Sequence, residues 1–268
     1  MKMLGAIIGD IAGSRFEWNN IKTKEFRLFD ERCKFTDDSV MTLAIAKAIL
    51  ECSGDLELLS DQTVKCMQDV GRHYPHCGYG GRFWRWIYTD DPQPYHSWGN
   101  GSAMRVSPVA WAARDMDECL AMSDAVTAVS HDHPEGLKGA RAIAAATFLA
   151  LHGSSKDEIK AEIESRFGYD LSFTLDSIRD SYTFDVSCMG TVPPAIVAFL
   201  ESEDFIDAIR NAISIGGDSD TLAACTGAIA EAYYGIPVMT RDFAETYLDA
   251  RLGDILTRFE LAFPGKTV

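Results

Sequence analysis

Acidic and hydroxyl side chains gather where two very apolar segments begin, VMTLAIAKAIL and LAACTGAIA. They are Thr36, Asp37 and Asp38 before the first segment, and Asp218, Asp220 and Thr221 before the second. A helix that is apolar on every side is buried, so its first turn is poorly solvated. One side chain can cap such a helix, but several close carboxylates in a poorly solvated place have raised pKa values or need a cation. Each motif alone is compatible with capping and with cation binding.

The two helix starts would form a metal site if the fold brought them together. They would then offer four carboxylates and two threonine hydroxyls, which are hard ligands that suit Mg²⁺, Mn²⁺ or Ca²⁺. No histidine or cysteine is adjacent, which argues against zinc. Four carboxylates are enough for two ions with a bridging aspartate. The residue types alone therefore allow one or two divalent cations here.

A third acidic candidate, Glu17, lies in GDIAGSRFEW near the amino terminus. Gly5, Gly9 and Gly13 recur every four residues, so a helix here can pack closely through its glycine face and then open into a loop that presents Glu17. Asp10 would cap or orient other groups rather than catalyse. Taken by itself, Glu17 is better explained as a surface residue than as a catalytic one.

A glycine-rich stretch, SWGNGSAMR, follows an aperiodic segment. Gly99, Asn100 and Gly101 can adopt positive φ and expose successive amides, a nest that suits an anion such as pyrophosphate. Arg105 would add positive charge there or form a structural ion pair.

The pair His131-Asp132 allows a different metal site, of the HD phosphohydrolase type, with His73 and His76 as further ligands. Pro75 spoils a helical spacing of those two histidines. That arrangement would also leave both acidic helix starts without a role. We therefore rank it second, and expect His131 to cap a helix or face a ligand.

Apolar residues at three- and four-residue spacing predict an all-α fold of about ten helices. We expect one compact orthogonal multi-helix domain over residues 1–268. Sustained strand alternation is nearly absent, with Glu25 to Phe29 the most plausible exception. HYPHCGYGGRFWRW and TDDPQPYHSWGNGSAM are expected to be ordered loops, and Pro193-Pro194 to stand at a helix start. The predicted helices are Val40–Glu51, Asp61–Gly71, Met116–Val129, Pro134–His152, Lys156–Phe167, Val192–Glu201, Asp204–Ser214, Thr221–Tyr234 and Asp242–Phe263.

Composition excludes several classes of function. The 268 residues carry 25 Lys and Arg against 40 Asp and Glu, a net charge of −15, which disfavours nucleic-acid and membrane-surface partners. Seven scattered cysteines without a C-x-x-C pair fit reduced thiols. The apolar start is broken by Asp10, Arg15 and Glu17, so we do not expect it to be a signal peptide. We expect a cytoplasmic monomer.

Taken in order, the motifs resemble those of the ADP-ribosylglycohydrolase family, which includes the dinitrogenase-reductase-activating glycohydrolases. T-D-D-S followed far downstream by G-G-D-S-D-T is the most specific part of the resemblance, which spans roughly residues 4 to 235. The matching pieces are GAIIGDIAGSRFEW, FTDDSVMT, GYGGRFWRW, GNGSAMRVSP, SHDHPEGLKGA and IGGDSDTLAACTGAIAEAYYG.

The resemblance implies a dimetal Mg²⁺ or Mn²⁺ cleft that removes ADP-ribose from a modified protein or small conjugate by cleavage at C1″. It implies catalytic roles for Glu17, Asp37 and Asp38. The implied metal ligands are Thr36, Asp37, Asp38, Asp218, Asp220 and Thr221. The implied ADP-ribose contacts are Ser97, Trp98, Gly99, Asn100, Gly101, Ser102 and His131.

One departure concerns the linkage that is cleaved. Some arginine-specific relatives place an acidic residue just before the glycine-rich loop, where this chain has Ser97-Trp98. The candidate substrates are therefore arginine-linked, serine-linked and small-molecule conjugates of ADP-ribose. A catalytically silent ADP-ribose-binding relative is the alternative from another class of function.

Overall fold

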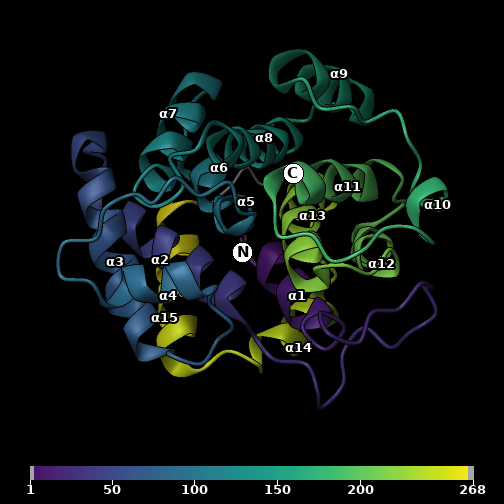
Figure 1. Cartoon of the computed structure of the whole chain (residues 1–268), viewed down its shortest axis with the longest axis horizontal. Coiled ribbons are helices and arrows are strands. Elements are labelled where there is room, and N and C mark those ends of the chain that lie inside the picture. Colours follow the sequence, from purple (N-terminus) through teal and green to yellow (C-terminus); the bar gives the residue numbers. More distant parts are fainter. Residues whose placement is uncertain (1–2, 265–268) are drawn as a thin grey trace.

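The computed structural model describes residues 3–264, which form fifteen α-helices and one turn of 3-10 helix (Figure 1). Over this range there is no β-strand, and one isolated bridge joins Gly99 to Ser187. The all-α prediction is confirmed. None of these helices is long and apolar enough to cross a membrane. The helices are α1 (Gly5–Gly13), α2 (Asp37–Cys52), η1 (Leu56–Leu58), α3 (Leu59–His73), α4 (Gly81–Tyr88), α5 (Gly101–Met104), α6 (Pro108–Ala112), α7 (Met116–Thr127), α8 (Pro134–Leu151), α9 (Lys156–Phe167), α10 (Leu175–Ile178), α11 (Cys188–Leu200), α12 (Phe205–Ser214), α13 (Ser219–Tyr234), α14 (Val238–Glu245) and α15 (Ala250–Ala262).

Several sequence predictions of local structure were wrong. The segment Asp242–Phe263 is divided between α14 and α15, because Asp249 accepts hydrogen bonds from the first amides of α15 and starts a new helix. One expected loop contains α4, whose buried Phe83, Trp86 and Ile87 have the spacing of an amphipathic helix. Residues 25–29 form no strand.

Pro193 and Pro194 lie inside α11, and not at its start as predicted. Proline has no N–H to donate to the carbonyl four residues earlier, so Pro194 leaves the Gly190 carbonyl without its helical partner. The Tyr182 hydroxyl donates a 2.9 Å hydrogen bond to that carbonyl. This bond replaces the one lost at Pro194 and helps the helix tolerate an interior proline.

The centre of the molecule is the close antiparallel pair α1 and α13, which lie side by side in Figure 1. A Cβ on Gly5, Gly9 or Gly13 would lie under 3.0 Å from backbone atoms of α13. Gly5 faces Gly227 near one end of the pair, and Gly13 faces Ser219 at the other. The predicted glycine face is therefore confirmed, and it brings the middle of α1 close to the start of α13.

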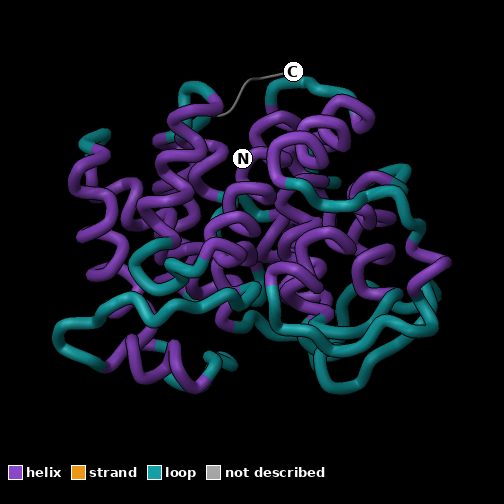
Figure 2. The backbone as a smooth tube through the Cα atoms, turned by 45° about the horizontal axis from the view of Figure 1, so that its top comes forward, coloured by secondary structure: helices purple, strands orange, loops and turns teal. Residues whose placement is uncertain are grey.

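The remaining helices surround this pair. Helix α2 packs between α3, α15 and α1, while α8, α11 and α12 cover α13. Figure 2 shows that much of the loop backbone gathers along one edge of the helical body. The core is largely aliphatic and alanine-rich, and it runs continuously through α1, α2, α8, α11 and α13.

Candidate active site

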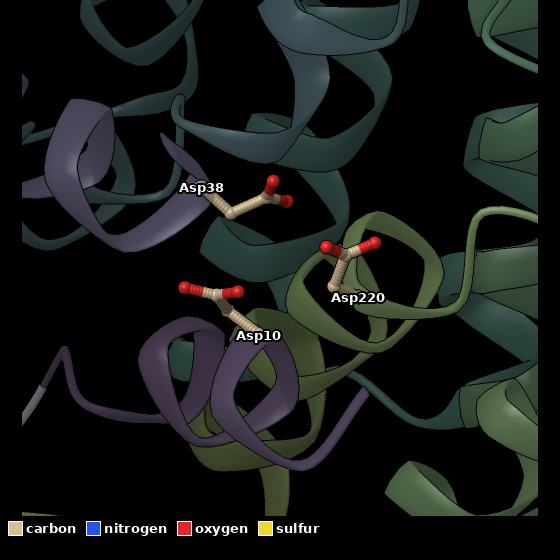
Figure 3. A group of neighbouring side chains, drawn as sticks. All are labelled: Asp10, Asp38 and Asp220. Atoms are coloured by element: carbon tan, nitrogen blue, oxygen red, sulfur yellow. The ribbon is translucent and has the colours of Figure 1, made fainter. Parts of the chain in front are cut away.

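The starts of α2 and α13 meet beside the middle of α1. Oxygen atoms of Asp10, Asp38 and Asp220 lie within 4.8 Å of one another, and all three residues are buried. Figure 3 shows the three carboxylates pointing toward a common point from α1, α2 and α13. The Thr221 hydroxyl lies 3.4 Å from Asp38 Oδ2. The tertiary fold thus brings together the two acidic motifs that are separated by 180 residues of sequence.

Asp10 orients the start of α2. Its Oδ2 accepts hydrogen bonds from the backbone amides of Thr36 (2.9 Å) and Ser39 (3.0 Å), and its Oδ1 accepts one from the Thr36 hydroxyl (2.7 Å). The Ser39 hydroxyl also donates to Asp10. Asp10 thus satisfies amides that a helix start leaves unpaired, which agrees with its predicted capping or orienting role. It is also a member of the acidic cluster, which was not predicted.

A second group contains Glu17, Asp218 and Asp220, again with oxygen atoms within 4.8 Å of one another. Glu17 follows α1 on the loop that the glycine-faced helix opens into, and it is half-buried. Asp218 Oδ2 accepts a 2.7 Å hydrogen bond from Asn100 Nδ2, which ties the glycine-rich loop to this group. Asp220 belongs to both groups.

Burial and mutual repulsion raise the pKa values of these carboxyl groups. Loss of solvation is the largest cause in every case. It raises the pKa of Glu17 to about 7 and that of Asp37 to about 8, with repulsion from Asp218 and Asp10 adding to the shifts. The pKa values of Asp38 and Asp220 lie well above their ordinary value for the same reasons. Without a cation, the folded protein disfavours full ionisation of the cluster.

The donor set fits hard divalent cations. Asp38 Oδ1 is buried without a hydrogen-bond partner, an unfavourable state for a carboxylate unless a cation is bound. Every group of three or more metal-ligand side chains found in residues 3–264 consists of carboxylates alone. Oxygen-only sites suit Mg²⁺ or Mn²⁺. The identity of the ion and the number of ions stay predictions.

A cavity of about 480 Å³ opens beside the acidic cluster. This volume is within the range of small-molecule sites. Of the expected site residues, two do not line it. Thr36 lies behind the cluster, bonded to Asp10, and the buried Ser102 hydroxyl donates to the Gly136 carbonyl at 2.9 Å. The lining includes Glu17, Asp37, Asp38, Ser97, Trp98, Gly99, Asn100, Gly101, His131, Asp218, Asp220 and Thr221.

The glycine-rich loop does not form the expected nest. Neither Gly99 nor Gly101 has positive φ, and Asn100 is in the right-handed helical region with φ of −65°. The Asn100 amide donates to the Val186 carbonyl at 2.8 Å. Glycine is needed here for space, because a Cβ on Gly101 would lie 3.3 Å from His131 Nε2. The Gly101 amide is the first of the short helix α5, at the edge of the cavity.

His131 is neutral and has a defined tautomer. Burial and the positive charge of Arg105 lower its pKa well below the ordinary value. Arg105 Nη2, which can only donate, lies 3.4 Å from His131 Nδ1, and the Ser130 hydroxyl lies 2.8 Å from the same atom. Nδ1 is therefore an acceptor, and Nε2 carries the proton beside the glycine-rich loop.

The HD-type arrangement has no metal site among the described residues. Asp132 accepts a 2.7 Å hydrogen bond from the His96 amide at the surface. His73 lies at the end of α3, where its ring packs against Tyr74. None of the candidate metal groups in residues 3–264 includes His131 or Asp132.

Several cavity residues were missed by the sequence reasoning. Trp18, next to Glu17, stacks on Phe184 with ring centroids 5.0 Å apart, and both side chains are exposed at the cavity. Arg82 and Tyr95 line another wall, with the Arg82 guanidinium 4.8 Å from the centre of the Tyr95 ring. In the sequence, the one indication that Trp18 belongs to the site was its position next to Glu17. Nothing local pointed to Phe184.

The all-α fold and the acidic cleft agree with one class of protein, the ADP-ribosylglycohydrolases. A sequence profile of the ADP-ribosylglycohydrolase family matches residues 2–262, so the chain belongs to that family and is a hydrolase of that class. It is 26% identical to ADP-ribosylhydrolase ARH3 of Xenopus tropicalis, over 92% of this chain and 91% of that protein. It is also 26% identical to ADP-ribosylarginine hydrolase Tri1 of Pseudomonas putida (strain GB-1), over 91% of this chain and 72% of that protein. A solved structure described as an ADP-ribosylglycohydrolase-related protein complex has a TM-score of 0.68 and 26% identity, over 96% of this chain and 95% of that one.

Proposed function

We propose that this chain is a dimetal-dependent hydrolase that releases ADP-ribose from a modified protein side chain or a small-molecule conjugate. The bond cleaved is the one at C1″ of the distal ribose. The observation that carries the proposal is the pair of overlapping carboxylate groups, which share Asp220 at the edge of a ligand-sized cavity. Family membership and relatives named as ADP-ribosylhydrolases support it.

Five residues that line the cavity at the starts of α2 and α13 would hold the cations: Asp37, Asp38, Asp218, Asp220 and Thr221. The sixth predicted ligand, Thr36, would reach them only from behind the cluster, where its hydroxyl donates to Asp10. Bound divalent cations supply charge that fixes ribose hydroxyls and favours ionisation of a water molecule. Asp10 keeps the α2 ligands oriented through its bonds to Thr36 and Ser39. Asn100 does the same for Asp218.

Glu17 is suited to proton transfer. Its carboxyl is half-buried beside Asp218, and its raised pKa of about 7 in the metal-free protein is close to neutral pH, where a general base is most effective. As the bond at C1″ breaks, positive charge develops on the ribose, and nearby carboxylates stabilise that charge. Asp37 and Asp38 would share this work.

The glycine-rich loop would hold the remainder of ADP-ribose. The Gly101 amide at the start of α5 and the protonated Nε2 of His131 are donors beside the cavity. Ser97 and Trp98 line the same wall, with Trp98 exposed so that a planar base can stack on it. These groups would bind phosphates and adenosine without a large positive surface.

The test is release of ADP-ribose from a panel of arginine-linked, serine-linked and small-molecule conjugates, with Mg²⁺ or Mn²⁺, followed by chromatography. We expect release from at least one linkage, and a fall in kcat of about 100-fold or more in Glu17→Gln with KM little changed. Release that persists in a metal chelator would contradict the dimetal proposal. Binding of ADP-ribose without turnover on any conjugate would instead support a silent relative.

A further inference from the structure

The side chain of Asn20 joins two segments that carry candidate site carboxylates. Its Oδ1 accepts a 2.7 Å hydrogen bond from the Gly217 amide, and its Nδ2 donates a 2.9 Å hydrogen bond to the Gly217 carbonyl. The same Nδ2 donates to the carbonyls of Phe16 (2.7 Å) and Glu17 (2.9 Å). One amide group therefore bonds the backbone of Glu17 and the residue directly before Asp218.

The turn that Asn20 holds has two hydrogen bonds of its own: the Gly216 amide donates to the Ile213 carbonyl at 3.0 Å, and the Ser219 hydroxyl donates to the Gly217 carbonyl at 3.3 Å. Gly216 and Gly217 have φ of 69° and 76°, a conformation that side-chain-bearing residues rarely adopt. A Cβ on Gly217 would lie under 3.0 Å from the Tyr182 ring, so no larger residue fits. Because glycine restricts the backbone little, contacts from other segments contribute to the position of this turn. A side-chain amide offers a donor and an acceptor side by side, and so pairs with both backbone groups of Gly217.

We propose that Asn20 is a positioning residue for the reaction: it sets the distance between the carboxylates of Glu17 and Asp218. These two groups and Asp220 form one of the two candidate metal groups, with oxygen atoms within 4.8 Å of one another. The catalytic part of this inference rests on the proposed function, whereas the effect on metal binding does not. Asn20 itself is not among the residues that line the cavity.

Lys22 also contacts the segment before Gly217, but through different residues. Lys22 Nζ donates 2.6 Å hydrogen bonds to the carbonyls of Tyr182 and Ile215. It makes no hydrogen bond to Gly217 or to the Glu17 backbone. Lys22→Met therefore removes two hydrogen bonds from the same loop without touching the proposed link, and it serves as the control.

The experiment compares wild type, Asn20→Ala and Lys22→Met in three measurements. These are calorimetric titration with Mn²⁺, kcat and KM on the best conjugate, and urea unfolding of the metal-free protein. We expect Asn20→Ala to weaken Mn²⁺ binding at least 10-fold, the usual size of effect for a residue that orients metal ligands. We expect kcat to fall about 10- to 100-fold and KM to change less than threefold, because misplacement of reacting groups affects the rate. Lys22→Met should lose stability only.

The outcomes separate this inference from the proposed function. If wild type releases ADP-ribose and Asn20→Ala matches Lys22→Met in Mn²⁺ affinity and kcat, Asn20 is only an anchor for the loop and the inference is overturned. If no conjugate is cleaved but Asn20→Ala alone loses Mn²⁺ affinity, the metal-binding part of the inference stands, and its catalytic part fails together with the proposed function. A crystal structure of metal-free Asn20→Ala gives an independent test: unchanged positions of Glu17 and Asp218 would also overturn it.

Discussion

At the scale of single residues, the site is dominated by charge brought into a poorly solvated place. Asp38 and Asp220 are 3% exposed, and so cannot be stabilised by bulk water. Asp10 is fully buried but has four hydrogen-bond donors, whereas one oxygen of Asp38 has none. That difference separates a carboxylate that orients the chain from one that needs a cation.

Asp218→Asn should remove metal binding and leave the fold intact. The substitution keeps an oxygen that can accept from Asn100, but it removes a charge close to Glu17 and Asp220. We expect a loss of Mn²⁺ affinity of at least about 100-fold, which is the upper end for residues that only orient ligands. The metal-free stability should be unchanged or slightly higher because repulsion is relieved.

The measurements are calorimetric titration with Mn²⁺ and urea unfolding. Asp170→Asn is the matched control, since it makes the same chemical change at an exposed position. Mn²⁺ binding as tight as in wild type would show that Asp218 is not a ligand.

At the scale of elements, the site depends on how closely α1 approaches α13. The glycine face lets the two helix backbones touch, and this places Asp10 of α1 beside Asp220 at the start of α13. Glu231 of α13 accepts a 2.6 Å hydrogen bond from the Gly5 amide and so caps α1 at the far end of the pair. The geometry of the acidic cluster is thus a consequence of helix packing.

Gly9→Ala should destabilise the protein by about 3 kcal/mol, the upper range for overpacking. The added Cβ would lie under 3.0 Å from the backbone of Ala223, which no side-chain rotation can relieve. Gly253→Ala is the control, because that glycine lies in α15 with no heavy atom within 4 Å of the added carbon.

Alanine at Gly253 should stabilise the protein by roughly 0.5 to 1 kcal/mol through helix propensity. Urea unfolding of both variants gives the comparison. Equal stability of Gly9→Ala and wild type would mean that the α1 and α13 backbones do not pack this closely.

At the scale of the whole molecule, acidity is spread over the surface and concentrated in the cleft. A net charge of −15 leaves no general attraction for an anionic ligand. Binding of ADP-ribose would therefore depend on local groups: cations in the cleft, the amide at the start of α5 and the Nε2–H donor of His131. This dependence predicts that stability and ligand binding both respond strongly to divalent cations.

The metal-free protein should become less stable as pH rises. Glu17 and Asp37 have pKa values of about 7 and 8 in the fold, above their ordinary values of 4.5 and 3.8. Between the ordinary and the raised pKa of each group, the folded state binds more protons than the unfolded state. The free energy of unfolding therefore falls with increasing pH. The stabilisation is complete below about pH 4 and is lost through about pH 8.

Saturating Mn²⁺ should offset the loss of stability at higher pH. A cation present at 100 times its Kd adds about 2.7 kcal/mol, which corresponds to a rise in Tm of roughly 5 to 10 °C for a chain of this size. Calorimetry from pH 5 to 9, with chelator or with Mn²⁺, gives the measurement. A metal-free Tm that increases over this range would contradict the raised pKa values.

Much of this protein could be predicted from local sequence patterns. Apolar periodicity indicated most of the long helices, and the four-residue spacing of Gly5, Gly9 and Gly13 indicated a tightly packed face. The acidic starts of α2 and α13 were recognisable because carboxylates rarely precede such apolar segments without a partner. These signals are local, since each depends on residues within one or two helical turns.

The tertiary structure decided what those elements do together. It placed Asp10 in the cluster, brought Phe184 against Trp18, and showed that the glycines near Asn100 make room for His131 instead of adopting positive φ. Each of these facts depends on contacts between segments far apart in the chain, for which a local pattern carries no information. The sequence by itself determined which residues could do chemistry, and the packing of α1 against α13 decided which of them share one site.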